Sequence, residues 1–547
     1  MKKIRHIIFL IILMLSFQTI QTLHAQSRKI PHLKQQGTAA QLVVDGWPML
    51  ILGGELGNSS ASSLEYMEPI WPKLVKMHVN TALVPVYWEL VEPAEGQFDF
   101  ALVDSLIFQA RRHELRLVFL WFASWKNSMS CYTPLWVKSD QVRFPRAKNA
   151  SGKSMEMLSC FSGENLKADA RAFTALMHHI KEVDSGHRTV VMIQVENEIG
   201  MIPDARDHNA EADRLFQQPV SSELINYLDK NRDRLIPEFF DMWKKTGFRK
   251  NGSWEQVFGK GLHSEEIFMA WYYARYVNVV ASAGKSEYPL PMYVNAALIR
   301  PDYQPGQYPS AGPLPHIMDV WRAGAPSIDF LSPDIYFPNF EEWCIKYQRS
   351  GNPLFIPEAA GGRLAAVNVL YAIGNHDAIG FCPFSIESTN DPENNPLTQS
   401  YDIMSQLSPL ILQNQGKGRM AGVLVDGENQ EKRIKLGDYT FVCTHEYTSK
   451  WTSRSIDEDP WPRMSCLIIQ IGRDEFVIAG SGVIVTFEPA EEGAFIAGIG
   501  AIDEGRYVDG IWTPGRRMNG DQSHQGRHMR LSNWEFGIQR VKLYRYQ

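Results

Sequence analysis

The amino-acid sequence predicts an α/β fold, a (β/α)8 barrel followed by an all-β sandwich domain. Short apolar, β-rich runs alternate with segments of helical periodicity from about residue 48, whereas beyond about residue 410 short strands follow one another without helices. The 547 residues exceed what one compact core usually holds. We therefore expect a leader over 1–25, a barrel over 26–409 and a sandwich over 410–547.

Eight runs of the first domain are almost continuously apolar, which is typical of parallel strands covered by helices on both faces. They span 49–52, 81–87, 117–122, 190–195, 292–295, 328–331, 354–356 and 379–384. This number of strands favours a closed barrel. A doubly wound open sheet is the alternative, but 53–57 lacks the glycine-rich phosphate turn that such sheets usually carry after their first strand.

Helical patterns fill the intervals between these runs, for example over 168–183 and 264–280. The interval 201–291 is longer than one barrel helix needs, so we expect a helical insertion there that lies over the barrel and shapes a pocket. In the second domain, strands are expected at 421–425, 439–442, 467–471, 475–479, 483–487 and 541–544, separated by turn-forming residues.

The first 25 residues have the pattern of a secretory signal peptide. Lys2, Lys3 and Arg5 precede the apolar run 7–15, and cleavage is expected near Ala25. The run is short for a bilayer span, although an uncleaved anchor is the alternative. We expect an exported protein, periplasmic or secreted, with no membrane attachment after cleavage.

Net charge and cysteine spacing argue against a nucleic-acid-binding protein and against a structural zinc site. The net charge is −6 and loss of the leader's three basic residues would bring it to −9, which disfavours a nucleic-acid partner. The six cysteines show no paired spacing for a structural zinc site. Cys131 and Cys160 could form a disulfide in an exported protein, and buried free thiols are the alternative.

Carboxylates follow two of the predicted strands, at the barrel face where active sites lie. Glu196, Asn197 and Glu198 come after the fourth strand, and Glu358 comes after the seventh. Two facing carboxylates suit glycoside hydrolysis, because one protonates the departing sugar oxygen while the other attacks the anomeric carbon. In a retaining enzyme the two lie about 5–5.5 Å apart. The alternative for each glutamate alone is an ordinary surface salt bridge.

Aromatic residues near other strand ends would suit stacking on sugar faces, although each alone is more often a core residue. The candidates are Tyr87, Trp121, Trp125 and Tyr336.

At these motifs the sequence resembles the retaining β-galactosidases of glycoside hydrolase family 35, within the wider clan of barrels with glutamates after strands four and seven. The resemblance rests on VVDG at 43–46, GGEL at 53–56, VNT at 79–81, EPAEGQFDF at 92–100 and QVENEIG at 194–200. It implies that Glu198 is the acid/base, that Asn197 contacts the hydroxyl next to the anomeric carbon, and that Glu358 is the nucleophile. Glu196 would point to the opposite face of the strand and have a structural role.

Glu55 and Asn295 are further candidates for contacts with the sugar. The sequence departs from the family at Pro85 and Ser124, where residues that hold galactose hydroxyls are expected. The short architecture resembles the bacterial branch that removes galactose from plant polysaccharide side chains, and this implies that the sandwich supports the barrel edge without adding catalysis.

These observations predict a secreted, retaining exo-β-galactosidase that needs no metal or cofactor and acts on a β-galactoside-containing glycan. The alternatives are a related endo-acting β-glucanase or β-mannanase, and a glycan-binding protein without catalysis. The oligomeric state is left open by the sequence.

Overall fold

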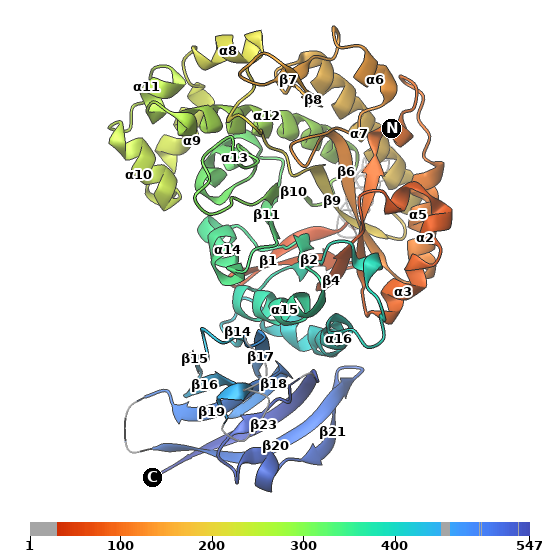
Figure 1. Ribbon diagram of the computed structural model, residues 1–547. Helices are drawn as coiled ribbons and strands as arrows, with labels where there is room; N and C mark the ends of the chain where they lie inside the picture. Colours follow the sequence, from red (N-terminus) through yellow and green to blue (C-terminus); the bar gives the residue numbers. More distant parts are fainter. Residues whose placement is uncertain (1–29, 450–459, 492, 494, 534) are drawn as a thin grey trace, which may run out of the picture.

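The computed structural model describes residues 30–449, 460–491, 493, 495–533 and 535–547 (Figure 1). The predicted leader lies outside the described residues. Within them, eight parallel strands form one sheet in the order β12-β11-β10-β9-β6-β5-β4-β13. A parallel bridge between Ile356 and Phe381 joins its two edge strands, so the sheet closes into the predicted barrel.

Each barrel strand is followed by a helix, as the alternating pattern predicts. The strands are β4 (Ile51–Glu55), β5 (Thr81–Tyr87), β6 (Arg116–Lys126), β9 (Val190–Asn197), β10 (Met292–Ala297), β11 (Phe330–Ile335), β12 (Glu358–Ala359) and β13 (Gly380–Phe381). The helices that follow them are α3 (Ile70–Lys76), α5 (Ala101–Arg112), α7 (Gly163–Asp184), α12 (Leu262–Glu287), α13 (Met318–Gly324), α14 (Phe340–Tyr347), α15 (Gly362–His376) and α16 (Pro396–Asn414).

The helical insertion is shorter than the sequence suggested. Helix α12 packs against α7 and β9 and is therefore the barrel's own fourth helix. The extra helices are α8 (Ala210–Phe216), α9 (Ser222–Lys230), α10 (Pro237–Lys245) and α11 (Trp254–Phe258). They contact α12, α13 and the turn before α13, and thus lie at the periphery of the barrel (Figure 1).

Further short elements lie outside the repeated strand–helix units. An N-terminal sheet of β1 (His32–Gln36), β2 (Ala39–Val44) and β3 (Trp47–Met49), which the sequence did not predict, precedes the first barrel strand. Helices α2 (Leu64–Met67), α4 (Trp88–Val91) and α6 (Leu135–Ser139) and the hairpin of β7 (Arg146–Lys148) and β8 (Ser154–Leu158) lie in the loops between barrel elements.

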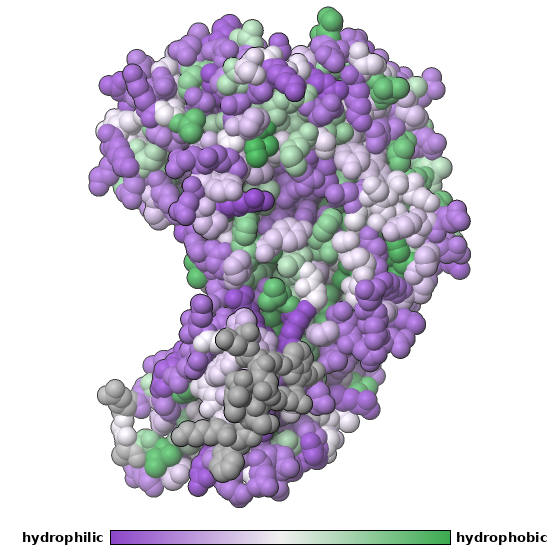
Figure 2. Space-filling view, viewed as in Figure 1, coloured by the Kyte–Doolittle hydropathy of each residue, from purple (hydrophilic) through white to green (hydrophobic). Residues whose placement is uncertain are grey.

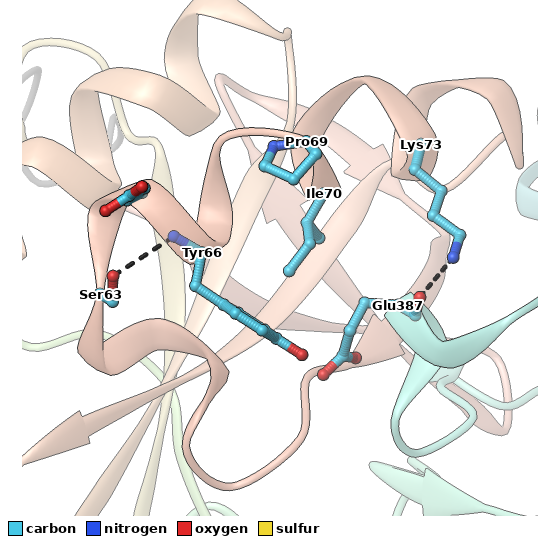
Figure 3. Close-up of a pocket in the computed structure, with 7 residues that line it drawn as sticks. Ser63, Tyr66, Pro69, Ile70, Lys73 and Glu387 are labelled. Atoms are coloured by element: carbon cyan, nitrogen blue, oxygen red, sulfur yellow. Dashed lines mark hydrogen bonds between the residues drawn. The ribbon is translucent and has the colours of Figure 1, made fainter.

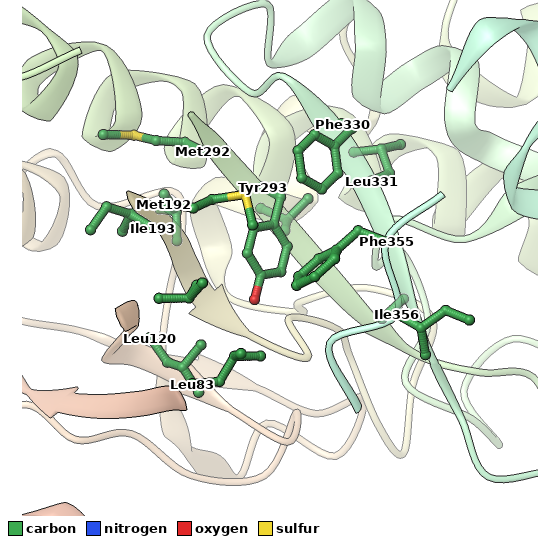
Figure 4. Packing of buried hydrophobic residues seen from close by; sticks show 14 of the residues in the cluster. Leu83, Leu120, Met192, Ile193, Met292, Tyr293, Phe330, Leu331, Phe355 and Ile356 are labelled. Atoms are coloured by element: carbon green, nitrogen blue, oxygen red, sulfur yellow. The ribbon is translucent and has the colours of Figure 1, made fainter. Parts of the chain in front are cut away.

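Large apolar side chains fill the barrel interior, as Figure 4 shows. Tyr293 on β10 stacks on Phe330 with ring centroids 5.4 Å apart and meets the edge of Phe355 at 5.2 Å. Aromatic pairs in this geometry add about 0.5–1.5 kcal/mol each beyond the burial of their surface. Because apolar side chains fill the interior of the barrel, polar side chains of the strands gather at the strands' carboxyl ends.

The C-terminal domain consists of two antiparallel sheets, as predicted. Among the described residues, one sheet has the order β14-β17-β18-β23-β20-β21 and the other β15-β16-β19-β22. The strands are β14 (Met420–Val425), β15 (Glu431–Leu436), β16 (Tyr439–His445), β17 (Met464–Gln470), β18 (Glu475–Ser481), β19 (Val483–Pro489), β20 (Ile496–Val508), β21 (Ile511–Arg517), β22 (Met529–Arg530) and β23 (Gly537–Tyr546).

The apolar cluster of the barrel extends into the sandwich, because Leu424, Leu467 and Ile469 belong to it. The interior of the sandwich forms a second cluster of its own. Helix α15 crosses β14 so closely that a Cβ added at Gly374 would lie 2.9 Å from the backbone nitrogen of Gly422. The sandwich is thereby fixed against the barrel through backbone-to-backbone packing.

All six cysteines are free and buried, so Cys131 and Cys160 do not form a disulfide in this structure. Among the described residues, no helix combines the length and apolar character that a bilayer crossing requires.

Candidate active site

Glu198 and Glu358 face each other at the carboxyl ends of β9 and β12. Carboxylate oxygens of Glu198, Asp334 and Glu358 all lie within 4.8 Å of one another. The side chains are buried, with relative exposures of 7 % for Glu198 and 4 % for Glu358. Carboxyl groups about 5–5.5 Å apart are the geometry of retaining glycosidases, whereas inverting enzymes need room for a water between them.

The backbone around Glu198 adopts an unusual conformation. Glu196 has a φ of 62° and Glu198 a φ of 44°, in the left-handed region that non-glycine residues rarely adopt. Two contacts hold this turn: the Glu198 N–H donates to Asn295 Oδ1 at 2.9 Å, and Ser128 Oγ donates to the Glu198 carbonyl at 2.7 Å. Backbone strain of this kind persists only where the surroundings fix it, and here it aims Glu198 across the barrel mouth.

Three side-chain donors point at Glu358. The Tyr336 hydroxyl donates to Oε2 at 2.8 Å, and the amides of Asn197 and Asn295 lie 3.3 and 3.4 Å from Oε1. Donors placed in this way stabilise the negative charge of a carboxylate. The arrangement suits an ionised nucleophile.

Glu198 has the opposite character. Burial, followed by the nearby charge of Glu358, raises the pKa of Glu198 to about 7. The charge of Lys126 and a hydrogen bond from Asn127 act in the other direction and favour the ionised form. A carboxyl group poised near neutral pH can give a proton in one step and take one in the next.

Lys126 also orients Asn197. Its Nζ donates to Asn197 Oδ1 at 2.6 Å, which leaves the amide nitrogen of Asn197 directed at Glu358. Lys126 and Asn127 were not among the site residues predicted from the sequence. Strand β6 runs to Lys126, beyond the apolar run that ended at 122, and Asn127 follows the strand directly.

Asp334 is a further acidic residue that sequence reasoning missed. It lies in β11, beyond the apolar run 328–331, and accepts a hydrogen bond from Asn295 Nδ2 at 2.8 Å. Burial, reinforced by the charge of Glu358, raises the pKa of Asp334 well above its usual range. Among the described residues, Glu198, Asp334 and Glu358 have the spacing of a metal site.

Glu55, at the end of β4, lies with this group. It is completely buried, and neither of its carboxyl oxygens has a hydrogen-bond partner among the described residues. Burial, and then the charge of Glu358, raises the pKa of Glu55 well above its usual range. A neutral carboxyl group with a free donor and acceptor is suited to sugar hydroxyls.

Of the predicted sugar-binding residues, the structure brings together Glu55, Asn197, Asn295 and Tyr336. Tyr87, Trp121 and Trp125 are instead packed in the protein interior, with exposures of 3 %, 0 % and 0 %, so the prediction that they stack on a sugar is corrected.

Each of these three aromatics has an internal partner. The Tyr87 hydroxyl donates to the Asn58 carbonyl, and Trp121 Nε1 donates to Asp169 on α7. Trp125 packs edge-on against Tyr276 of α12, with ring centroids 4.7 Å apart. Trp121 and Trp125 lie on β6, which is buried on both faces. An aromatic residue on such a strand can point into the protein interior as well as toward the active site, and these two point into the interior.

Glu196 points away from the pair, in line with its expected structural role. Its Oε2 accepts from the Trp125 N–H at 2.9 Å, and the charge of Asp169 acts on it from α7. Asp169 in turn accepts from Ser124 at 2.5 Å and from Tyr276 at 3.1 Å. This buried network joins β6 and β9 to the helices behind them and thereby supports Glu198.

A separate pocket of about 570 Å³ lies beside α2 and α3 (Figure 3). It is lined by Ser63, Glu65, Tyr66, Pro69, Ile70, Lys73 and Glu387, and so contains neither Glu198 nor Glu358. Figure 3 shows Tyr66 and Glu387 directed toward each other across it. Glu387 also accepts from the Gly57 N–H at 2.8 Å, which ties the last barrel loop to the first.

Comparison with known families agrees with this geometry. Residues 64–246, which include Glu198, match the family model of glycoside hydrolase family 42, described as beta-galactosidase. This part of the chain is thus similar to a glycoside hydrolase domain. The finer resemblance to family 35 is not supported by this match.

Residues 397–530 match a family model described only as a domain of unknown function. None of the curated proteins compared matches the chain.

Several solved structures resemble the fold at low sequence identity. A β-galactosidase from Bacillus circulans sp. alkalophilus has 14% identity and a TM-score of 0.45, covering 66% of this chain and 57% of its own. A β-galactosidase from the psychrophilic Marinomonas ef1 has 10% identity and a TM-score of 0.46, covering 68% and 62%. The catalytic domain of a β-amylase from Paenibacillus polymyxa has 13% identity and a TM-score of 0.44, covering 63% and 94%. The chain therefore spans about three fifths of the β-galactosidases' length.

Proposed function

We propose that this protein is a retaining exo-β-galactosidase that removes terminal β-galactosyl residues from plant-type glycans. The observation that carries the proposal is the spacing of Glu198 and Glu358, within 4.8 Å, together with their contrasting surroundings. The galactosyl preference is supported by the family match of residues 64–246.

The reaction proceeds in two displacements. Glu358 attacks the anomeric carbon as the glycosidic bond breaks, and Glu198 gives its proton to the departing oxygen. A water molecule then attacks the ester-linked sugar, while Glu198 takes the proton of that water and Glu358 leaves as the free carboxylate. Asn197 and Glu55 hold hydroxyls of the sugar during both steps.

The proposal is tested with purified protein on aryl β-galactoside, β-glucoside, β-mannoside and α-arabinoside. We expect release from the β-galactoside, lost by Glu358→Gln and Glu198→Gln and unchanged in Glu68→Gln, which alters an exposed glutamate on the surface. Proton NMR of the reaction at early times should show the β-anomer of galactose first. Release only from internal bonds of a polymer would indicate an endo-acting enzyme, and binding without turnover a glycan-binding protein.

Export is proposed as well, on the basis of the leader pattern at residues 1–25. Expression of the full chain with a reporter fused at its C-terminus, followed by fractionation and N-terminal sequencing, tests it. A protein in the cell envelope or medium that begins near residue 26 is expected, and an intact leader on cytoplasmic protein would contradict it.

A further inference from the structure

A large pocket lies where the barrel meets the sandwich. Its volume is about 860 Å³, and both domains line it. The barrel contributes the segment after β11 and the start of α15, while the sandwich contributes the loop between β14 and β15 and the segment before β17. Figure 2 shows the surface hollowed between the two domains.

Tyr336 links the pocket to the catalytic pair. The hydroxyl of this residue donates to Glu358 at 2.8 Å, while its side chain, 46 % exposed, lines the pocket. Ala360, two residues after Glu358, lines it too. A group bound here would therefore lie next to a sugar held on Glu358.

The lining has the chemistry of a carbohydrate site. Tyr336, Phe337 and Trp461 offer aromatic rings, and Asn368 is 7 % exposed with an Oδ1 that has no hydrogen-bond partner among the described residues. Aromatic faces pack on the apolar face of a sugar ring, and an unpaired buried acceptor favours a hydroxyl donor.

Three charged side chains line the pocket, Asp426, Glu428 and Arg463, and two of them form a pair. Arg463 lies 3.5 Å from Asp426 and donates to the Pro338 carbonyl at 3.1 Å, which joins the sandwich to the barrel loop. A paired charge of this kind favours a neutral ligand over an ionic one. The contact also fixes the wall that carries Trp461.

We propose that this pocket is the leaving-group subsite, in which the neutral sugar behind the cleaved bond packs on Trp461 and bonds Asn368. The inference rests on the proposed exo action, because an enzyme that takes one terminal sugar has only the leaving group beyond its catalytic pair. The C-terminal domain then takes part in substrate selection, in contrast to the supporting role that the resemblance implied.

The test compares two substrates that differ only in the leaving group. β-Galactosyl fluoride places a single atom beyond the cleaved bond, whereas a β-galactosyl disaccharide places a sugar in the subsite. In Trp461→Ala we expect kcat/KM for the disaccharide to fall at least fivefold and that for the fluoride to stay within twofold. Trp461→Phe should recover most of the loss, and Trp512→Ala, in β21 of the same domain, should change neither substrate.

The outcomes separate the two proposals. An equal loss on both substrates, or no loss on the disaccharide, would overturn the subsite and leave the enzyme a β-galactosidase. No turnover of the fluoride by the unaltered protein would instead overturn the proposed function, and the subsite with it. If Trp461→Ala does not fold, Asn368→Ala replaces it, with a selective loss on the disaccharide expected to be at least threefold.

Discussion

Replacing Asn127 with glycine is expected to extend activity to higher pH. The Asn127 amide donates to Glu198 Oε2, and a donor stabilises the ionised form of a carboxyl group. Its removal therefore raises the pKa of Glu198 above the present value of about 7. Because Glu198 must carry a proton to act as the acid, the active form then persists to higher pH.

The size of this shift follows from the hydrogen bond. A hydrogen bond to a charged group contributes about 1.5–3 kcal/mol, and one pKa unit corresponds to about 1.4 kcal/mol. Water entering the space of the lost amide replaces part of the interaction. We therefore expect the alkaline limb to move upward by about one unit.

The assay is kcat/KM for an aryl β-galactoside between about pH 4 and pH 10 at constant ionic strength, since this parameter reports the free enzyme. Glycine is the replacement of choice because Asn127 has a φ of 55°, which alanine adopts poorly. Asn251→Gly, at an exposed loop position, is the matched control. An alkaline limb that stays in place or moves to lower pH would refute the assignment of Glu198 as the proton donor.

Three further predictions concern the acid, the buried carboxyl and the domain junction. Glu198→Ala should lose most activity on aryl galactosides with poor leaving groups and little on those with good ones. Added azide should yield β-galactosyl azide, measured by product NMR. An equal loss of activity for all leaving groups would contradict the role of Glu198 as the acid. Glu55→Gln should melt as the unaltered protein does only below about pH 4, where the Glu55 carboxyl is neutral in both the folded and the unfolded state. Because burial raises the folded-state pKa of Glu55, the unaltered protein loses stability as pH rises from the unfolded pKa to the folded one, so the variant should be the more stable at neutral and alkaline pH. A difference in melting temperature that stays the same at every pH would show that the pKa of Glu55 is not raised. Gly374→Ala should lower the free energy of unfolding by roughly 1–3 kcal/mol, because the added Cβ would lie 2.6 Å from Leu467 and 2.9 Å from Gly422. Gly186→Ala is the control and should leave the free energy of unfolding unchanged, because nothing lies within 4 Å of the added Cβ. Denaturant titration measures both.

Much of the catalytic centre could be predicted because a parallel barrel brings distant segments to one face. Glu198 and Glu358 are 160 positions apart in the chain, yet each follows an apolar run that ends at the same rim. Asn197, Asn295 and Glu55 come to the same face for the same reason. The polar residues at strand ends were thus a sufficient signal for them.

Other residues could not be placed by this reasoning. Asp334 and Lys126 lie in strands that run beyond their apolar stretches, so their positions at the rim depend on strand ends that composition does not mark. Trp121 and Trp125 lie on a strand buried on both sides, where neither alternation nor hydrophobicity tells inside from outside.

The eight strands, the two domains and the two opposed glutamates could be read from the amino-acid sequence, because they follow from local hydrophobic periodicity and from the geometry common to all parallel barrels. Three properties became visible only in the folded chain: which aromatic residues reach the site, how Glu198 acquires a pKa near neutrality, and the pocket at which the sandwich meets the barrel near Glu358. These properties depend on contacts between segments far apart in the chain, and such contacts leave no periodic trace in the sequence.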